Sequence, residues 1–205
     1  MKIFGIYLAA GKSRRMGADK RKLPLGGVPL GSIALNQALI SKLDHIFIVT
    51  ALGDKLDWLQ ASFFLYPAKE RWSLLECPDA EQGLGSSLKY GVKHAAVSGA
   101  DAAMVLLADQ PFVRSEVINK LIDCYQSAPS LFIGAEGDEG FAKPPILFSS
   151  ECFRYVEKLG EDQGLRAFVR KEFRTRGKTI DFRVPLLFCD IDTKEDYHSL
   201  MEKFR

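Results

Sequence analysis

Short apolar runs alternate along most of the chain with stretches whose apolar residues recur at helical spacing. Five apolar runs are predicted to be strands: Lys2–Leu8, His45–Thr50, Trp72–Cys77, Ala102–Leu107 and Leu131–Ala135. Four stretches with helical spacing are predicted to be helices: Pro29–Lys42, Lys55–Phe63, Ser86–Val97 and Ser115–Ser127, the last with Ser115 as its cap. This alternation predicts an α/β fold with a single doubly wound, mostly parallel sheet.

The last third of the chain is less regular. Three further strands are expected at Pro145–Phe148, Thr179–Val184 and Leu186–Asp190, with a loop over Gly134–Pro145. Three further helices are expected at Ser150–Lys158, Leu165–Phe173 and Lys194–Phe204. Neither a repeat nor a linker interrupts the pattern, so we expect one domain over residues 1–205.

Composition and charge limit the kinds of partner and the cellular location that we expect for the chain. The 205 residues carry a net charge of only +2, which argues against nucleic acid or membrane as a partner. Six basic residues nevertheless gather between positions 12 and 22, which favours a small anionic ligand: Lys12, Arg14, Arg15, Lys20, Arg21 and Lys22. No run approaches the ~20 apolar residues of a membrane span. The four cysteines are widely spaced, which argues against zinc and favours a reducing, cytoplasmic location.

The first loop has the composition of a phosphate-binding segment. Ligands of doubly wound sheets bind beyond the carboxyl ends of the strands, and this loop follows the first strand. Its small residues Ala9, Ala10 and Gly11 allow close approach of the backbone to a ligand, and Arg and Lys side chains follow. The glycines fit neither a Walker A loop nor a Gly-x-Gly-x-x-Gly fingerprint. By spacing alone, a solvated basic turn remains an alternative.

The string Leu-Ala-Ala-Gly-x-Ser-x-Arg-Met-Gly-x-x-Lys, from Leu8 to Lys20, resembles the signature of one enzyme family. These are the nucleotidyltransferases that use a nucleoside triphosphate on sugar phosphates, alditol phosphates or molybdopterin, and they have a Rossmann-like fold. The resemblance implies a catalytic, phosphate-neutralising role for Arg15 and Lys20. It also implies that the nucleotide contacts Leu8, Ala9, Ala10, Gly11, Ser13, Arg15 and Lys20. The run Lys20-Arg21-Lys22 leaves open whether Lys20 or Lys22 reaches the α-phosphate.

A second glycine-bearing loop, Gln82–Leu88, joins a predicted strand to a predicted helix. Its glycines permit a tight turn, and Ser86 or Ser87 is placed to cap the helix. On this segment alone, a plain connecting loop with an N-cap explains these residues better than a ligand site does. The loop is similar to the family's Gly-x-x-x-Ser-Leu segment, which implies that Gly83 and Ser87 lie near the nucleotide.

Asp109 follows the buried apolar strand that ends at Leu107. A carboxylate at such a place is costly unless it has a partner, and Mg²⁺ bridging phosphate oxygens is a natural one. An N-cap for the next helix is the alternative. The family has a similar Ala-Asp-x-Pro segment, in which the Asp binds the metal.

Two further acids, Asp190 and Asp192, stand where the last predicted strand meets the last helix. Asp192 or Thr193 is placed to cap that helix, with Glu195 and Asp196 in its first turn. The segment resembles the family's closing Asp-x-Asp-Thr-x-Glu-Asp motif. The resemblance implies that one of these acids completes the metal site opposite Asp109. Asp192 is the first candidate and Asp190 is the second.

The segment between these motifs resembles the molybdopterin branch of the family. That branch has a Pro-x-x-Phe strand followed by Gly-Asp-x-Gly-x-Arg, and this chain departs from it in having Pro144 where a histidine is usual. The match implies that four residues contact the acceptor: Pro145, Asp162, Gly164 and Arg166. For Arg166, a surface helix position remains an alternative.

Together the motifs most resemble the molybdenum cofactor cytidylyltransferases. This implies Mg²⁺-dependent transfer of CMP from CTP to the terminal phosphate of a molybdopterin-type acceptor, with release of pyrophosphate. Ala10 resembles the CTP-using members, because the GTP-using branch usually has glycine at that position. The product would be the dinucleotide cofactor of xanthine dehydrogenase-like enzymes, whose apo-enzyme is then a possible partner.

Two other functions stay open. One is a cytidylyl- or uridylyltransferase for a sugar or alditol phosphate, which the segment from Gly160 to Arg166 argues against. The other is a carrier or insertion chaperone for the cofactor, which has no need of two metal-binding acids. A nicotinamide oxidoreductase is disfavoured because its glycine fingerprint is missing.

Overall fold

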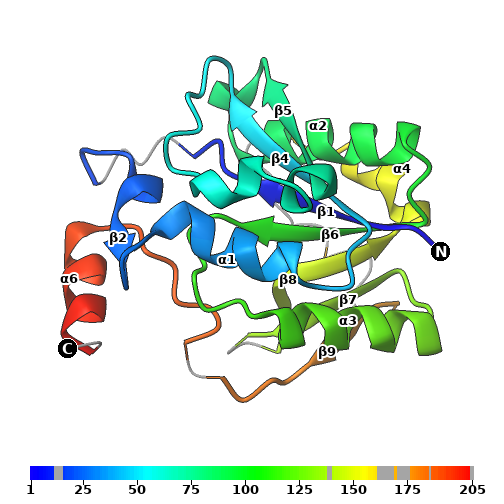
Figure 1. Cartoon of the computed structure of the whole chain (residues 1–205). Coiled ribbons are helices and arrows are strands. Elements are labelled where there is room, and N and C mark those ends of the chain that lie inside the picture. The colour runs from blue at the N-terminus through cyan, green and yellow to red at the C-terminus, as the bar shows by residue number, and fades with distance from the viewer. Residues whose placement is uncertain (12–15, 138–139, 161–168, 170–175, 185, 204–205) are drawn as a thin grey trace.

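We describe a computed structural model of the chain, covering residues 1–11, 16–137, 140–160, 169, 176–184 and 186–203 (Figure 1). Its central sheet has seven strands in the order β5-β4-β1-β6-β8-β7-β9. The strands are β1 (Ile3–Leu8), β4 (His45–Ala51), β5 (Trp72–Cys77), β6 (Ala102–Leu107), β7 (Phe132–Glu136), β8 (Ala142–Ser149) and β9 (Lys178–Ile180). The four strands β5, β4, β1 and β6 are parallel, and only β8 runs against its neighbours. The predicted mostly parallel α/β fold is confirmed.

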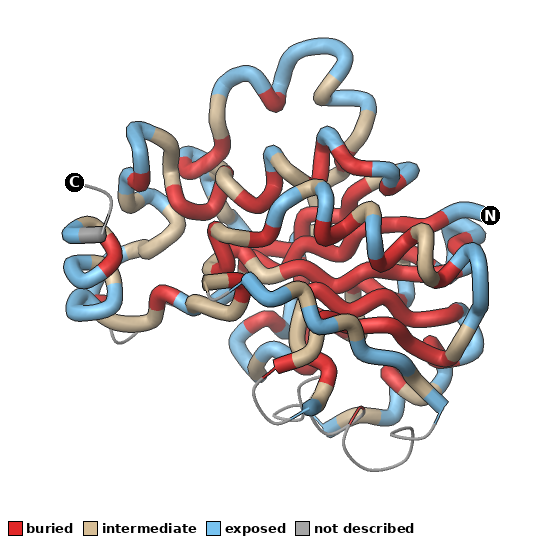
Figure 2. Tube along the Cα trace, turned by 90° about the horizontal axis from the view of Figure 1, so that it is seen from below, coloured by how far each residue is buried: buried red, intermediate tan, exposed pale blue. Residues whose placement is uncertain are grey.

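Helices cover both faces of this sheet and bury it. On one face, α1 (Leu30–Leu39) and α3 (Ser115–Ser127) pack on Ile3, Tyr7 and Met104. On the other face, α2 (Leu84–Val97) and α4 (Phe153–Val156) pack on Ile6 and Val105. Figure 2 shows the strands as a continuous buried layer. Double coverage explains why the central strands are apolar at nearly every position.

A smaller apolar cluster holds the end of the chain against the first third. Helix α6 (Lys194–Lys203) contributes Leu200, which packs with Leu25 and Leu30. Leu25 lies in the hairpin formed by β2 (Pro24–Leu25) and β3 (Val28–Pro29). The Tyr197 hydroxyl donates a hydrogen bond to the Pro24 carbonyl at 2.5 Å, and Figure 1 shows α6 beside β2. The last helix is thereby tied to the hairpin that follows the basic loop.

The predicted helix Lys55–Phe63 is wrong. The structure has turns there and then a short 3₁₀ helix, Ala61–Phe64. Leu56 has a φ of 55°, which ends any regular helix, and the Asp54 carboxylate accepts its backbone N–H. The apolar spacing in this segment reflects burial of Trp58 beneath the loop instead of a helix face.

The predicted loop Gly134–Pro145 is also wrong at both ends, because β7 extends to Glu136 and β8 begins at Ala142. The pairing register shifts between Gly134 and Ala135, opposite the two prolines of β8. A bulge of this kind lets a strand carry prolines, which lack the N–H for a regular ladder.

Other boundaries differ more modestly. Ser115 does not cap α3, whose N-cap is Arg114 without a side-chain bond. Ser150–Lys158 shortens to a 3₁₀ turn, Ser150–Cys152, and α4. Leu186–Asp190 contains a turn, and the strand expected at Thr179–Val184 ends at Ile180. The predicted helix Leu165–Phe173 lies outside the described residues except for Val169. No described helix is long and apolar enough to span a bilayer.

Candidate nucleotide and metal site

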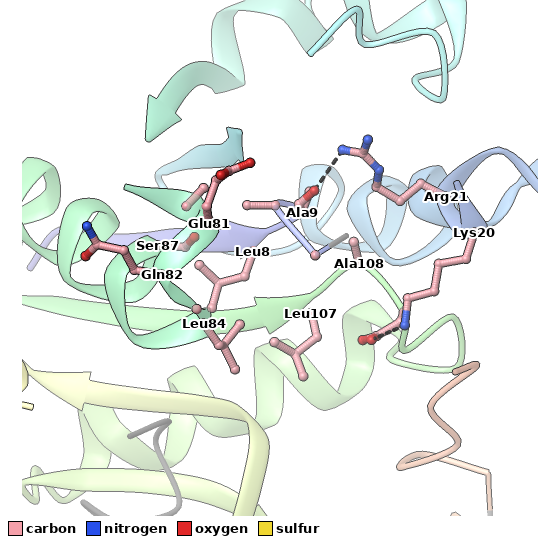
Figure 3. A pocket seen from close by; sticks show the side chains of 15 residues that line it. Leu8, Ala9, Lys20, Arg21, Glu81, Gln82, Leu84, Ser87, Leu107 and Ala108 are labelled. Carbon is pink, nitrogen blue, oxygen red and sulfur yellow. Dashed lines mark hydrogen bonds and ion pairs between the residues drawn. The ribbon is translucent and has the colours of Figure 1, made fainter. Parts of the chain in front are cut away.

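A cavity of about 440 Å³ opens at the carboxyl ends of β1 and β6. Two backbone bonds hold its floor together: Ala9 N–H donates to the Val49 carbonyl, and Ala108 N–H donates to that of Leu8. The walls come from the loops after β1, β5 and β6. They comprise Leu8, Ala9, Ala10, Gly11, Lys20, Arg21, Ala80, Glu81, Gln82, Gly83, Leu84, Ser87, Leu107, Ala108 and Asp109. In Figure 3, Lys20 and Arg21 lie on one side of this pocket, and Glu81, Gln82 and Ser87 on the other.

The structure therefore brings together eight of the site residues predicted from sequence: Leu8, Ala9, Ala10, Gly11, Lys20, Gly83, Ser87 and Asp109. Five others lie outside the described residues: Ser13, Arg15, Asp162, Gly164 and Arg166. Pro145 is buried in β8 and is not part of the cavity wall.

The loop after β5 meets α2 at Gly83, which is the N-cap of that helix. Its φ of 131° is a conformation that favours glycine, and this accounts for the residue type. Neither Ser86 nor Ser87 caps the helix, contrary to expectation, because α2 already begins at Leu84 and both serines are buried in its first turn. Helix α2 has no side-chain cap, and Gly83 and Leu84 at its start line the cavity.

Lys20 joins two carboxylates that are far apart in sequence. Its Nζ donates to Asp109 Oδ2 and to Asp192 Oδ1, both at 2.7 Å. The Lys20 side chain is only 12 % exposed, whereas those of Asp109 and Asp192 are 24 % and 49 % exposed. Burial alone would lower the lysine pKa, but attraction to the two carboxylates outweighs it and raises that pKa. We call these three residues the acid-pair cluster.

Backbone contacts fix Asp192 opposite Asp109. The N–H of Ile191 donates to the Asp109 carbonyl at 3.3 Å, and the Ile191 side chain is buried. Thr193 and Asp196 form a reciprocal cap at the start of α6, in which each side chain accepts the other's backbone N–H. Thr193 is thus the cap, and the Asp192 carboxylate is directed to Lys20.

Asp190 lies beside this cluster and not within it. Its Oδ1 accepts a hydrogen bond from Gln110 Nε2 at 2.9 Å. Partial burial of the carboxyl and the nearby charge of Asp109 raise the Asp190 pKa. Asp190 therefore has a structural partner already, which places it second to Asp192 as a candidate metal ligand.

The acid-pair cluster fits a divalent cation that is shared with phosphates. The two carboxylates converge on one cation, the ammonium of Lys20, and buried Asp109 Oδ1 has no hydrogen-bond partner among the described residues. The described chain offers no group of three or more acidic, histidine or cysteine ligands. Mg²⁺ suits such a site, because it commonly takes one or two carboxylates and completes its shell with phosphate and water.

Arg21 and its partners were not identified from the sequence. The Arg21 guanidinium donates to Asp19, to Asp54 and to the Ala9 carbonyl, while Lys22 pairs with Asp57 at the surface. A second cavity of about 260 Å³ lies beside these groups. Its wall comprises Ala9, Ala10, Gly11, Asp19, Arg21, Ala51 and Asp54. A basic run gives no hint of such internal pairing.

Comparison with known proteins identifies the family of the chain. A family described as the MobA-like NTP transferase domain matches residues 5–177. Purine catabolism protein PucB of Bacillus subtilis is 41 % identical over 198 residues, which cover 95 % of this chain and 94 % of that protein. A molybdenum cofactor guanylyltransferase of Cereibacter sphaeroides is 32 % identical over 167 residues, covering 79 % and 73 %.

A solved structure shares the fold. Rv0371c from Mycobacterium tuberculosis superposes with a TM-score of 0.76 at 24 % identity, covering 98 % of this chain and 99 % of that one. The same protein is also known in complex with manganese, with a TM-score of 0.71 at 22 % identity and the same coverage. The chain belongs to the MobA-like NTP transferase family and is a nucleotidyltransferase.

Proposed function

We propose that the chain transfers CMP from CTP to the terminal phosphate of a molybdopterin-type acceptor, with Mg²⁺ as cofactor and pyrophosphate as by-product. The observation that carries the proposal is the convergence of Asp109 and Asp192 on one cation at the mouth of a 440 Å³ cavity. A carrier of the cofactor has no need of that arrangement, whereas phosphoryl chemistry depends on it.

Asp109 and Asp192 would hold the metal, with Asp190 as the next candidate. Bound there, Mg²⁺ would supply charge stabilisation for the α-phosphate and for the incoming acceptor phosphate. The chain's own residues position the reactants. The Ala9–Gly11 backbone, Gly83 and, in the first turn of α2, Ser87 enclose the nucleotide.

Lys20 and, by the family resemblance, Arg15 neutralise the negative charge that develops on the leaving pyrophosphate. Lys22 has no phosphate-binding role in this proposal, because its ammonium is 2.6 Å from Asp57 and outside the cavity wall. No general base is required, since the acceptor's terminal phosphate is ionised near neutral pH. The role of the protein is therefore positioning and electrostatics.

The choice of nucleotide and acceptor rests on particular residues and relatives. Ala10 lines the cavity and favours CTP, as the resemblance implies. The name of the PucB relative concerns purine catabolism, which fits delivery of the cofactor to a xanthine dehydrogenase-like enzyme. Pro145, Asp162, Gly164 and Arg166 remain the proposed acceptor contacts. A cytoplasmic, single-domain protein is part of the proposal, and its four cysteines are free thiols.

GTP is the second candidate nucleotide. The observation in its favour is that several relatives are named molybdenum cofactor guanylyltransferases. The test is pyrophosphate release by the purified protein with Mg²⁺ and each of CTP, GTP, UTP and ATP, with and without molybdenum-loaded pterin cofactor. We expect release with CTP only when the pterin is present. Release with GTP alone would replace CTP by GTP. Tight binding of the pterin without release from any nucleotide would overturn the enzyme assignment in favour of a carrier.

A further inference from the structure

We propose that Arg21 is a positioning residue that fixes the floor of the nucleotide cavity and the direction of Lys20, and does not itself bind phosphate. The inference rests on the proposed function, because it concerns the same nucleotide site. It separates two adjacent basic residues that the sequence places in one anion-binding cluster.

The three nitrogens of the Arg21 guanidinium all donate to groups of the protein. Its Nη1 donates to the Ala9 carbonyl at 2.7 Å and to Asp54 Oδ2 at 2.5 Å. Its Nε and Nη2 donate to the two carboxylate oxygens of Asp19 at 2.9 and 2.8 Å. The side chain is 14 % exposed and its charge is matched by two carboxylates. We call Arg21, Asp19, Asp54 and the Ala9 carbonyl the Arg21 network.

These contacts act on the site from two directions. Ala9 forms part of the wall of both cavities, so a bond to its carbonyl holds the backbone that faces the nucleotide. Asp19 caps the 3₁₀ turn Lys20–Lys22 by accepting the Arg21 backbone N–H at 3.1 Å. Lys20 is the first residue of that turn. The network therefore also fixes the backbone of Lys20, whose side chain reaches Asp109.

The far end of the network is anchored in the core. The Asp54 side chain is 6 % exposed, and its Oδ1 accepts the Leu56 N–H at 2.9 Å and the Trp58 indole N–H at 3.1 Å. Trp58 is fully buried, and its ring centroid lies 5.0 Å from the guanidinium carbon. Arg21 thus links buried Asp54 and Trp58 to the backbone of Ala9 in the cavity floor, and Figure 3 shows its bond to Ala9.

A direct phosphate ligand would behave differently from a positioning residue. One lysine ammonium cannot reproduce a planar fork that reaches a carbonyl and two carboxylates at once. A lysine does retain the positive charge, so it would preserve much of a simple attraction to phosphate. Likewise, removing the charge of Asp54 would free a phosphate-binding Arg21 to bind phosphate more tightly. For a positioning Arg21, the same change would weaken its hold on the Ala9 carbonyl.

The test compares Arg21→Lys and Asp54→Asn with the wild type, using binding of CTP and of GTP with Mg²⁺ by calorimetry, without acceptor. Lys22→Met is the matched control, because Lys22 is adjacent and basic but pairs only with exposed Asp57 among the contacts described here. We expect Kd for the bound nucleotide to rise roughly tenfold to hundredfold in both Arg21→Lys and Asp54→Asn, and to stay unchanged in Lys22→Met. The double variant should bind no more weakly than the weaker single one, because both changes break one network.

Melting temperatures are measured alongside, and binding is assayed below every midpoint. Nucleotide affinity preserved in Arg21→Lys would overturn the inference, in favour of a purely structural residue if the melting temperature falls and of a simple phosphate ligand if it does not. Preserved or tighter binding in Asp54→Asn would overturn it in favour of a phosphate ligand, and this arm decides if Arg21→Lys does not fold. Wild-type binding without transfer to any pterin acceptor would count against the proposed function alone.

Discussion

Two ion clusters built around neighbouring residues, Lys20 and Arg21, differ in how exposed their carboxylates are and in what anchors them. In the acid-pair cluster, one ammonium serves two carboxylates whose side chains are 24 % and 49 % exposed. In the Arg21 network, a guanidinium lies between two carboxylates that are 25 % and 6 % exposed, and one of them is anchored to the core. Each cluster pairs one basic side chain with two carboxylates, but the first lies at a cavity mouth and has a carboxylate oxygen, Asp109 Oδ1, without a hydrogen bond among the described residues. Exposed carboxylates at a cavity mouth suit an incoming cation, whereas a buried cluster bonded to the backbone and the core suits a scaffold.

The largest effect is expected from Asp109→Asn. The change keeps the size of the side chain but removes the charge that would hold the metal, while leaving the Arg21 network intact. Charge stabilisation by a metal is worth several kcal/mol, so kcat should fall by roughly 1,000-fold or more. Pyrophosphate release measures this, with circular dichroism as the control for folding. Undiminished turnover would remove Asp109 from the mechanism.

Gly31→Ala is expected to disturb the packing of the Arg21 network. A Cβ at Gly31 would stand 2.7 Å from the Trp58 ring and 2.8 Å from Arg21 Cβ, so both must shift. Overpacking of this kind costs about 1–3 kcal/mol of unfolding free energy, and we expect weaker nucleotide binding as well. Denaturant unfolding and calorimetry measure the two effects. Asn36→Ala, at an exposed position of the same helix, is the control, and equal behaviour of the two variants would contradict the account.

Lys20→Met tests whether the acid pair needs a cation. Without the ammonium, Asp109 and Asp192 repel each other until a metal neutralises them, so Mg²⁺ should raise the melting temperature more in the variant than in the wild type. Each 1 kcal/mol that the metal adds to the unfolding free energy raises the melting temperature by about 2–4 °C for a chain of this size. Thermal denaturation with and without Mg²⁺ measures the difference. A smaller Mg²⁺ shift in the variant would show that Lys20 is not the stand-in for a metal.

The smallest effect concerns acid stability of the Arg21 network. Burial alone would raise the Asp19 pKa, but the bonds and charge of Arg21 outweigh it and lower that pKa. A carboxyl with a lowered folded-state pKa contributes stability above its unfolded value, near 3.9, that is lost as pH falls through the folded value. Asp19→Asn should therefore melt below the wild type at pH 6, and the difference should vanish toward pH 2. A difference that does not depend on pH would show that the charge of Asp19 is not involved.

The sequence predicted the sheet and most of the cavity because both depend on local signals. Apolar runs such as Ala102–Leu107 have few alternatives to a buried strand, and strand ends in a parallel sheet meet at one edge. Gly83 was also predictable, since a tight turn before a helix requires its conformation. The motif resemblance then assigned the loops after β1 and β6 to a single site.

What the sequence could not predict depends on partners that are distant along the chain. Leu56, Leu59 and Phe63 have the spacing of a helix, but the Asp54 carboxylate accepts the Leu56 N–H in a turn and Trp58 is buried beneath the loop. Arg21 stands in a basic run that is typical of a phosphate-binding loop. Only the positions of Asp19 and Asp54 show that its guanidinium donates hydrogen bonds within the protein. The exchange of caps between Thr193 and Asp196, which leaves Asp192 for Lys20, likewise becomes visible only in three dimensions.

The most direct test of the central claim is the binding of Mn²⁺, as a paramagnetic substitute for Mg²⁺, measured by electron paramagnetic resonance in the presence of CTP. We predict that the wild type binds the ion more tightly than CTP alone does, and that Asp109→Asn and Asp192→Asn lose this gain while Lys22→Met keeps it. Equal Mn²⁺ binding by the wild type and both acid variants would contradict the claim that Asp109 and Asp192 form the metal site of a nucleotidyltransferase.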